Sequence, residues 1–232
     1  MAIDYKNYHR DRQYRKDERL FRNIFQNRFN LIRPSLVEVS RGRILDIGCS
    51  NAIFLDLYRE SGWETWGVEP SENASVARVK GHKIIKSVFE KADLPKDYFD
   101  LVVLNHTLEH LDNPMKILKK VYGLLKRGGI LFVDVPNAGG LGAKILGDRW
   151  PYRLPDEHKW QFTRLSLSKI VKKAGFKILT FKSRSGIFEY ANPLLELSRP
   201  RFLLDLIMIP YSLIATLLNI GDSMSIIARA DT

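Results

Sequence analysis

The stretch from Arg43 to Phe54 constrains the fold more than any other part of the chain. Its apolar run, Ile44 to Ile47, reads as a buried strand. The strand runs straight into a tight turn, Gly48-Cys49-Ser50, and a helix with apolar residues at helical spacing follows. A strand, a glycine turn and a helix in this order predict an α/β fold that binds an adenosine-containing cofactor at the turn.

An acidic residue at the end of the next apolar run supports this prediction. Glu69 follows Asp46 by 23 residues and closes the run that begins at Thr65. In such folds, an acid at this distance accepts hydrogen bonds from the ribose hydroxyls of the cofactor. The glycine fingerprint of dinucleotide sites is incomplete, because Ser50 stands at its second glycine position.

Strand and helix signals then alternate along most of the chain, with Pro near helix starts and Gly at helix ends. Strands are expected at 43–48, 64–69, 82–86, 99–104, 129–135, 176–184 and 223–229. Helices are expected at 51–61, 72–79, 113–126 and 163–174, and also within residues 1–40, where Pro34 begins a helix toward Val39. This alternation predicts a Rossmann-like, doubly wound, seven-stranded and mostly parallel sheet with helices on both faces.

Four regions follow from this pattern. They are an N-terminal helical cap (1–40), a cofactor-binding core (41–186), an apolar helical insertion (187–221) and the final strand of the core (222–232).

The charge and the cysteine content bear on the class of binding partner and on the cellular compartment of the protein. The formal net charge is +11, and residues 1–43 carry eleven Lys or Arg against five acids. An anionic partner and a solvated basic helix face both remain open, although no nucleic-acid-binding module accompanies the charge. The single cysteine, Cys49, excludes an internal disulfide and a multi-cysteine metal site. With no secretory signal in the charged first 30 residues, we expect a cytoplasmic protein.

The insertion contains a long apolar run. Asp205 is the only charged residue between Phe202 and Leu218, and Pro210 interrupts the run. We therefore do not expect a transmembrane helix. Peripheral membrane contact through 199–218, a lid over the active site and a homodimer contact remain open.

Polar residues gather where the predicted strands end. They are Asp46 to Ser50, Glu69-Pro70-Ser71, Asn105-His106 and Pro136-Asn137. In a doubly wound sheet, ligands bind beyond the carboxyl ends of the strands. The sequence therefore predicts one site at this edge.

Several strings in this order carry a resemblance to a known family. They are Ile44–Cys49, Trp66–Ser71, Phe99–Leu111, Leu125–Ile130, Val135–Asn137 and His158–Thr163. With them the chain resembles class I S-adenosylmethionine-dependent methyltransferases, and is most similar to the group that contains the ubiquinone-biosynthesis O-methyltransferases.

The resemblance implies S-adenosylmethionine as the cofactor and assigns its binding residues. Gly48 allows close approach of the methionine part, Asp46 supports the turn near the amino group, and Glu69 takes the ribose hydroxyls. The remaining cofactor contacts implied are Cys49, Ser50, Pro70, Val88 and Phe89 beside the adenine, and Asn105 at the methionine end. Relatives usually have glycine at positions 50 and 52, where this chain has Ser50 and Ala52. A positive φ at Ser50 would cost about 1 kcal/mol.

Two histidines are the predicted catalytic residues. His106 follows a strand end at the site, and His158 follows the fifth strand; either could take a proton from the acceptor. The string from His106 to His110 also reads as H-x-x-E-H, a zinc-peptidase motif. It begins at a strand end and lacks clear further ligands, so no metal is expected. Glu109 and His110 are expected to cap the next helix or to fix the loop.

We therefore expect an enzyme that methylates an oxygen or nitrogen of a small acceptor, which could be lipid-linked, quinone-like or a glycan. A nucleic-acid methyltransferase is the less favoured alternative, and a non-catalytic module that lost cofactor affinity through Ser50 and Ala52 is another.

Overall fold

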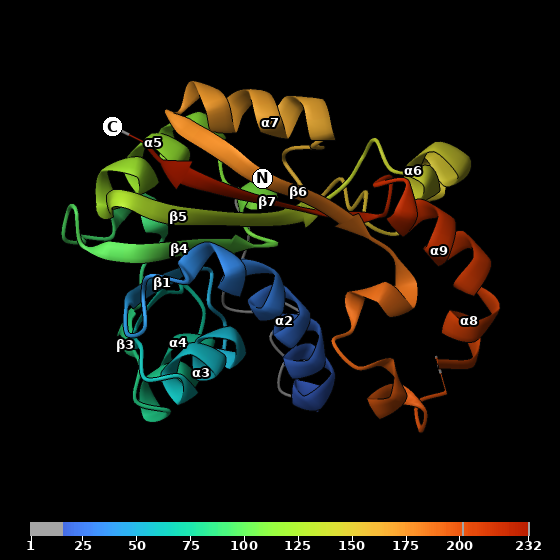
Figure 1. The fold of residues 1–232 in the computed structure, drawn as a ribbon, viewed down its shortest axis with the longest axis horizontal. Coiled ribbons are helices and arrows are strands. Elements are labelled where there is room, and N and C mark those ends of the chain that lie inside the picture. Colours follow the sequence, from blue (N-terminus) through green and yellow to red (C-terminus); the bar gives the residue numbers. More distant parts are fainter. Residues whose placement is uncertain (1–15, 201, 232) are drawn as a thin grey trace.

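The computed structural model describes residues 16–200 and 202–231 and shows one seven-stranded sheet (Figure 1). The strand order is β3-β2-β1-β4-β5-β7-β6. The strands are β1 (Arg43–Ile47), β2 (Glu64–Val68), β3 (Lys83–Ile85), β4 (Phe99–Asn105), β5 (Leu125–Pro136), β6 (Phe176–Arg184) and β7 (Ser223–Ala230). The first five strands pair in parallel, while β7 is antiparallel to both β5 and β6. The predicted fold class is confirmed.

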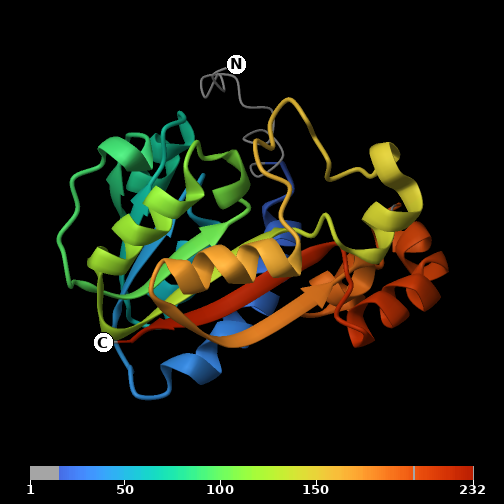
Figure 2. The ribbon, with the colours of Figure 1, turned by 90° about the horizontal axis from the view of Figure 1, so that it is seen from above.

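Helices cover both faces of the sheet (Figures 1 and 2). They are α2 (Glu18–Ile32), α3 (Ile53–Glu60), α4 (Asn73–Val79), α5 (Pro114–Leu124), α6 (Leu141–Leu146), α7 (Arg164–Lys173), α8 (Phe202–Ile207) and α9 (Ile209–Leu217). Alternate residues of the strands point to opposite faces, so the core has two parts. Leu45 and Ile47 of β1 pack with α5 and α7, whereas Ile44 packs with α2, α3 and α4.

Two predicted helix boundaries are wrong. The chain after Pro34 forms a single 3₁₀ turn, Arg33–Leu36, instead of a helix toward Val39. The helix predicted to reach residue 126 ends at Leu124, and β5 begins at Leu125, which pairs with Phe99 of β4. The pair Gly128-Gly129 therefore lies inside the strand, where Gly128 takes a positive φ of 75°.

The apolar run of the insertion forms two short helices, α8 and α9, which lie at one end of the molecule (Figures 1 and 2). Pro210 occupies the first turn of α9, where its missing N–H has no helical partner to lose. Among the described residues, no helix is long and apolar enough to cross a membrane.

The topology brings the predicted site residues to one edge of the sheet. β1 lies between β2 and β4, and the chain order reverses between β1 and β4. Because these strands are parallel, Gly48, Glu69 and Asn105 emerge at the same edge. This is the switch point at which open α/β sheets bind ligands.

Candidate functional site

The turn after β1 relies on left-handed backbone conformations. Gly48 has a φ of 79°, and its N–H donates to the carbonyl of Val68 at 2.8 Å. A Cβ at this position would lie only 2.6 Å from Oγ1 of Thr107. Any residue other than glycine would therefore clash with Thr107. Ser50 and Ala52 also have positive φ values, of 46° and 65°. These are the positions at which the family resemblance implies glycine, and the anticipated strain at Ser50 is present.

Glu69 is buried and fixed by the backbone around it. Its Oε2 accepts from the N–H of Ser50 and its Oε1 accepts from the N–H of Ser71, both at 2.8 Å. Asn73 in turn donates to Oγ of Ser50 at 2.8 Å. A carboxylate oxygen can accept more than one hydrogen bond, so Glu69 retains capacity for a pair of vicinal hydroxyls. Its predicted role toward the ribose stays a prediction.

Asp46 is a second buried carboxyl group close to Glu69. Burial, with a further contribution from the charge of Glu69, raises the pKa of Asp46 to about 8. Among the described residues, none of the Lys, Arg or His side chains forms an ion pair with Asp46. A ligand with a cationic amine would supply the missing positive charge. The charge and the shape of the turn therefore both fit the amino-acid end of S-adenosylmethionine.

The other predicted cofactor contacts differ in how accessible they are. Pro70 and Val88 are half-buried, whereas Cys49 and Phe89 are buried. Phe89 packs in the core, with Nζ of Lys120 lying 4.6 Å from its ring centroid. Burial, together with the nearby acids, raises the pKa of the Cys49 thiol. All four roles stay predictions, and Val88 is better placed than Phe89 to touch a ligand.

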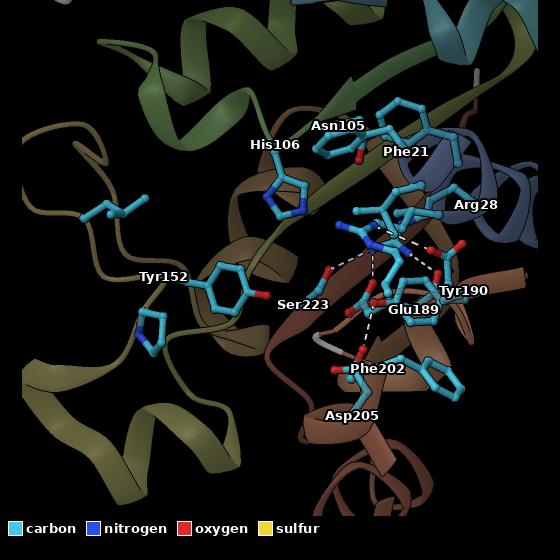
Figure 3. A pocket seen from close by; sticks show the side chains of 18 residues that line it. Phe21, Arg28, Asn105, His106, Tyr152, Glu189, Tyr190, Phe202, Asp205 and Ser223 are labelled. Carbon is cyan, nitrogen blue, oxygen red and sulfur yellow. Dashed lines mark hydrogen bonds and ion pairs between the residues drawn. The ribbon is translucent and has the colours of Figure 1, made fainter. Parts of the chain in front are cut away.

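Asn105 and His106 line a cavity of about 450 Å³ (Figure 3). Asn105 ends β4, and its buried Oδ1 has no hydrogen-bond partner among the described residues. His106 has a positive φ of 51°, and its N–H donates to the carbonyl of Asp134 at 2.8 Å. Its side chain points into the cavity in Figure 3, as predicted for a group that meets the acceptor.

Two buried carboxylates flank the His106 ring. Nδ1 lies 3.5 Å from Oε1 of Glu109, and Nε2 lies 3.5 Å from Oδ1 of Asp134. Burial by itself would raise the pKa of both acids. His106 and His110 hold the pKa of Glu109 below its ordinary value. Arg28 and His106 do the same for Asp134. Both acids are therefore ionised and place negative charge on either side of the His106 ring.

A buried network around Asp134 forms the floor of the cavity. Asp134 accepts from the hydroxyls of Ser223 and Ser225 at 2.7 and 2.8 Å and from Nε of Arg28 at 3.2 Å. Arg28 also pairs with the carboxylate of Glu189 and donates to its carbonyl at 3.0 Å. These contacts connect α2, β5, β7 and the segment after β6, and so hold the floor of the cavity rigid.

The sequence interpretation missed Asp134, Arg28 and Glu189. Two of them carried a signal: Arg28 lies on the apolar stripe of α2, four residues before Ile32, and Asp134 interrupts the apolar run of β5. A charge at a position that the pattern predicts to be buried requires a partner. Glu189 ends a short 3₁₀ turn, Gly186–Glu189, and carried no comparable signal.

His158 is placed differently from His106. It is buried, its Nδ1 lies 2.8 Å from the carbonyl oxygen of Tyr152, and its ring centroid lies 4.8 Å from that of His110. It does not line the cavity that contains His106. With Glu109 and His110 it forms a buried group whose candidate ligand atoms lie within 4.8 Å of one another. The structure thus places His158 beside Glu109 and His110 of the H-x-x-E-H motif, whereas His106 is not part of this group. The expectation that no metal binds stays a prediction.

Glu109 and His110 hold the loop that follows α6. Nδ1 of His110 lies 3.0 Å from the carbonyl oxygen of Glu157, and the carbonyl of Glu109 accepts from the N–H of Trp160 at 3.1 Å. They do not cap α5, because Asn113 does so through its Oδ1. Fixing the loop is the architectural role that the structure supports.

Comparison with known proteins agrees with this geometry. A methyltransferase domain family matches residues 8–180, which is more than half of the chain. The chain belongs to the methyltransferase domain family. S-Adenosylmethionine is the cofactor expected for it, as predicted from the sequence.

Relatives and solved structures agree with this family. The ubiquinone biosynthesis O-methyltransferase of Bradyrhizobium sp. (strain ORS 278) is 30% identical over 144 residues. That match covers 57% of this chain and 56% of the relative, so the chain spans little more than half the length of that curated relative. A solved S-adenosylmethionine-dependent methyltransferase from Thermotoga maritima has a TM-score of 0.64 at 20% identity, over 96% of this chain and 98% of its own. The phosphoethanolamine N-methyltransferase 2 of Haemonchus contortus, solved with S-adenosylmethionine, has a TM-score of 0.62 at 18% identity, over 99% of this chain and 60% of its own.

Proposed function

We propose that this chain is an S-adenosylmethionine-dependent methyltransferase that methylates a hydroxyl oxygen of a small acceptor bound in the 450 Å³ cavity. The observation that carries the proposal is the position of His106, which lines that cavity and lies between two buried carboxylates. A base is useful for a hydroxyl acceptor, because the oxygen loses its proton when it gains the methyl group.

The cofactor side of the proposal rests on the turn after β1. Gly48, Asp46 and Glu69 would hold the cofactor, and Asn105 would bound its methionine end. When bound, S-adenosylmethionine supplies a methyl group on a sulfonium, which a nucleophile takes by in-line displacement. The chain's own contribution is to align the acceptor, exclude water and accept a proton.

The surroundings of His106 support one of its two nitrogens as the acceptor of this proton. Asp134 already accepts from Ser223, Ser225 and Arg28. Glu109 has no hydrogen-bond donor on either carboxylate oxygen among the described residues at normal hydrogen-bond geometry. The single N–H of a neutral imidazole is therefore best placed at Nδ1, toward Glu109. Nε2 is then the base, and the resulting imidazolium lies between two carboxylates that stabilise it.

The cavity lining favours a hydroxylated ring as the acceptor. It combines aromatic side chains with carboxylates, and Arg28 is already paired with two acids. The aromatic residues are Phe21, Phe25, Tyr152, Tyr190 and Phe202, and the acids are Glu189, Glu196 and Asp205. Aromatic faces pack on a ring, and carboxylates accept from its hydroxyls. A quinone precursor and a sugar both have this chemistry.

We further propose that the ring is linked to a lipid. The apolar surface of α8 supports this part, because the same helix lines the cavity with Phe202 and Asp205. The ubiquinone biosynthesis relatives are consistent with a ring acceptor.

Two variants test the role of His106 against that of His158. Methyl transfer from labelled S-adenosylmethionine is measured with 3,4-dihydroxybenzoate and methyl glucoside as soluble ring acceptors. His106→Gln is expected to lower turnover by about 10²–10⁴-fold, the usual contribution of a general base. Its affinity for S-adenosylhomocysteine is expected to stay unchanged in calorimetry. His158→Gln keeps turnover within about tenfold of the parent. Full turnover of His106→Gln would refute the assignment.

A further inference from the structure

The end of the molecule formed by α6, α8 and α9 exposes an unusual amount of aliphatic surface. Ile207 of α8 is 73% exposed, Leu217 of α9 is 72% exposed and Ile145 of α6 is 66% exposed. The other large exposed side chains of these helices are Leu146, Leu203, Leu204, Leu206, Leu213 and Ile214, with Met208 and Leu218 adjoining α9. A contiguous apolar surface of this kind marks a binding face.

The three helices lie together at this end of the molecule, and their exposed aliphatic side chains are called here the apolar end face. The N–H of Leu141 at the start of α6 donates to the carbonyl of Ile220 just after α9, at 2.7 Å. A Cβ on Gly142 of α6 would lie 2.7 Å from the hydroxyl oxygen of Tyr211 in α9. Both ribbon views show α6 beside α9 (Figures 1 and 2).

Polar groups of α8 and α9 point away from this face. Asp205 accepts from the hydroxyl of Tyr190 at 3.1 Å, and the hydroxyl of Tyr211 donates to Asp222 at 2.7 Å. Ser212 is fully buried. Every exposed residue between 203 and 218 is therefore aliphatic or proline. No exposed polar or aromatic side chain interrupts the face along these two helices.

The composition of the apolar end face favours a lipid membrane over a protein as its binding partner. Protein interfaces are rich in aromatic residues and are surrounded by a polar rim, and α8 and α9 show neither on their exposed side. Lipid acyl chains contact apolar side chains without any hydrogen bond, so a membrane needs no polar groups on the protein face. Two helices too short to cross a bilayer can lie in its surface. The formal net charge of +11 favours an anionic surface, as do the exposed cations Lys144 of α6, Arg149 just after α6 and Lys182 of β6.

We propose that the apolar end face docks on an anionic lipid membrane and so presents the cavity to a lipid-linked acceptor. The second half of this statement rests on the proposed function. α8 links the two halves, because Leu203 and Ile207 lie on the exposed face while Phe202 and Asp205 line the cavity. An acceptor could then keep its lipid in the membrane while its ring occupies the cavity.

Vesicle co-sedimentation tests the face with a matched control. The full chain is mixed with vesicles of phosphatidylglycerol and phosphatidylcholine, or of phosphatidylcholine alone. The test variant is Ile207→Gln with Leu217→Gln. The control is Val37→Gln with Leu165→Gln, which changes two apolar residues of 82% and 79% exposure on other elements. Gln keeps helix propensity and adds no charge.

The parent and the control are expected to sediment with the anionic vesicles, and the test variant is expected to partition at least tenfold less. Equal partitioning of test variant and parent would overturn the proposal, as would a parent that binds no vesicles. Sedimentation velocity adds a third arm: a parent dimer that the test variant dissociates, with no vesicle binding, would make the face a contact between two copies and overturn the membrane proposal.

Calorimetry with S-adenosylhomocysteine keeps this test separate from that of the proposed function. The test variant is expected to bind S-adenosylhomocysteine as the parent does, which also shows that it is folded. A parent that binds vesicles but not S-adenosylhomocysteine would refute the methyltransferase proposal and leave membrane docking supported.

Discussion

The buried carboxyl group of Asp46 predicts a stability that falls as the pH rises. Its pKa is about 8 in the folded chain, because of burial and the neighbouring Glu69, against an ordinary value of 3.8. Between pH 4 and pH 8 the folded chain therefore holds a proton that the unfolded chain has released. Over this window the free energy of unfolding decreases by about 1.4 kcal/mol per pH unit from this group. At pH 7 the accumulated loss is about 4 kcal/mol.

Asp46→Asn removes this titration and nearly preserves the shape of the side chain. We expect urea unfolding of the parent and of the variant to give similar stabilities near pH 4. The difference should grow in favour of the variant up to pH 8 and then stop growing. Asp93→Asn, at an exposed carboxyl group, serves as the control and is expected to follow the parent. Parallel stability curves for the parent and Asp46→Asn would refute the reasoning.

The same group couples the cofactor to a proton. A cationic amine beside Asp46 favours the ionised carboxylate, so binding of S-adenosylhomocysteine near pH 6.5 is expected to release about one proton in the parent. Calorimetry in buffers with different ionisation enthalpies counts this proton, and Asp46→Asn should not release it.

Three further changes test other parts of the site. Gly48→Ala is expected to destabilise the chain by at least about 1–2 kcal/mol in urea unfolding, because of its positive φ and the contact with Thr107. Adding Thr107→Ala should relieve the clash with Thr107 but not the strain of the positive φ. Arg28→Met leaves Asp134 and Glu189 without their buried cation and should lower the free energy of unfolding by about 3–5 kcal/mol. Arg22→Met, at an exposed pair with Glu60, is the control and should lower it by less than about 1 kcal/mol. Glu109→Gln removes the carboxylate that lies 3.5 Å from Nδ1 of His106, so we expect a turnover at least tenfold lower. Full turnover of this variant would exclude Glu109 as the partner of His106.

The strands and their mostly parallel arrangement could be predicted from sequence because the apolar runs are short, bounded and separated by capped helices. The boundary error at β5 has a physical cause: Gly128-Gly129 is a helix-end signal locally, but Leu125 gains a strand partner in Phe99 that only the tertiary fold provides. The polar residues at the strand ends were correctly expected at one edge, because parallel strands bring their carboxyl ends together.

The surroundings of the candidate base His106 were predicted less completely. His106 was found because it directly follows a strand end, whereas its partner Asp134 lies 28 residues further along the chain and meets it only across β4 and β5. His158 was grouped with His106 by residue type, yet the loop after α6 packs it against His110 instead. Side-chain pairs that join distant elements leave no local periodicity to read.

A crystal structure with S-adenosylhomocysteine tests the central claim most directly. The account predicts the ribose hydroxyls on the carboxylate of Glu69, the amino group near Asp46, and the sulfur facing the cavity beside Asn105 and His106. Adenine in the cavity, or a sulfur atom that faces His158 and lies away from His106, would contradict it.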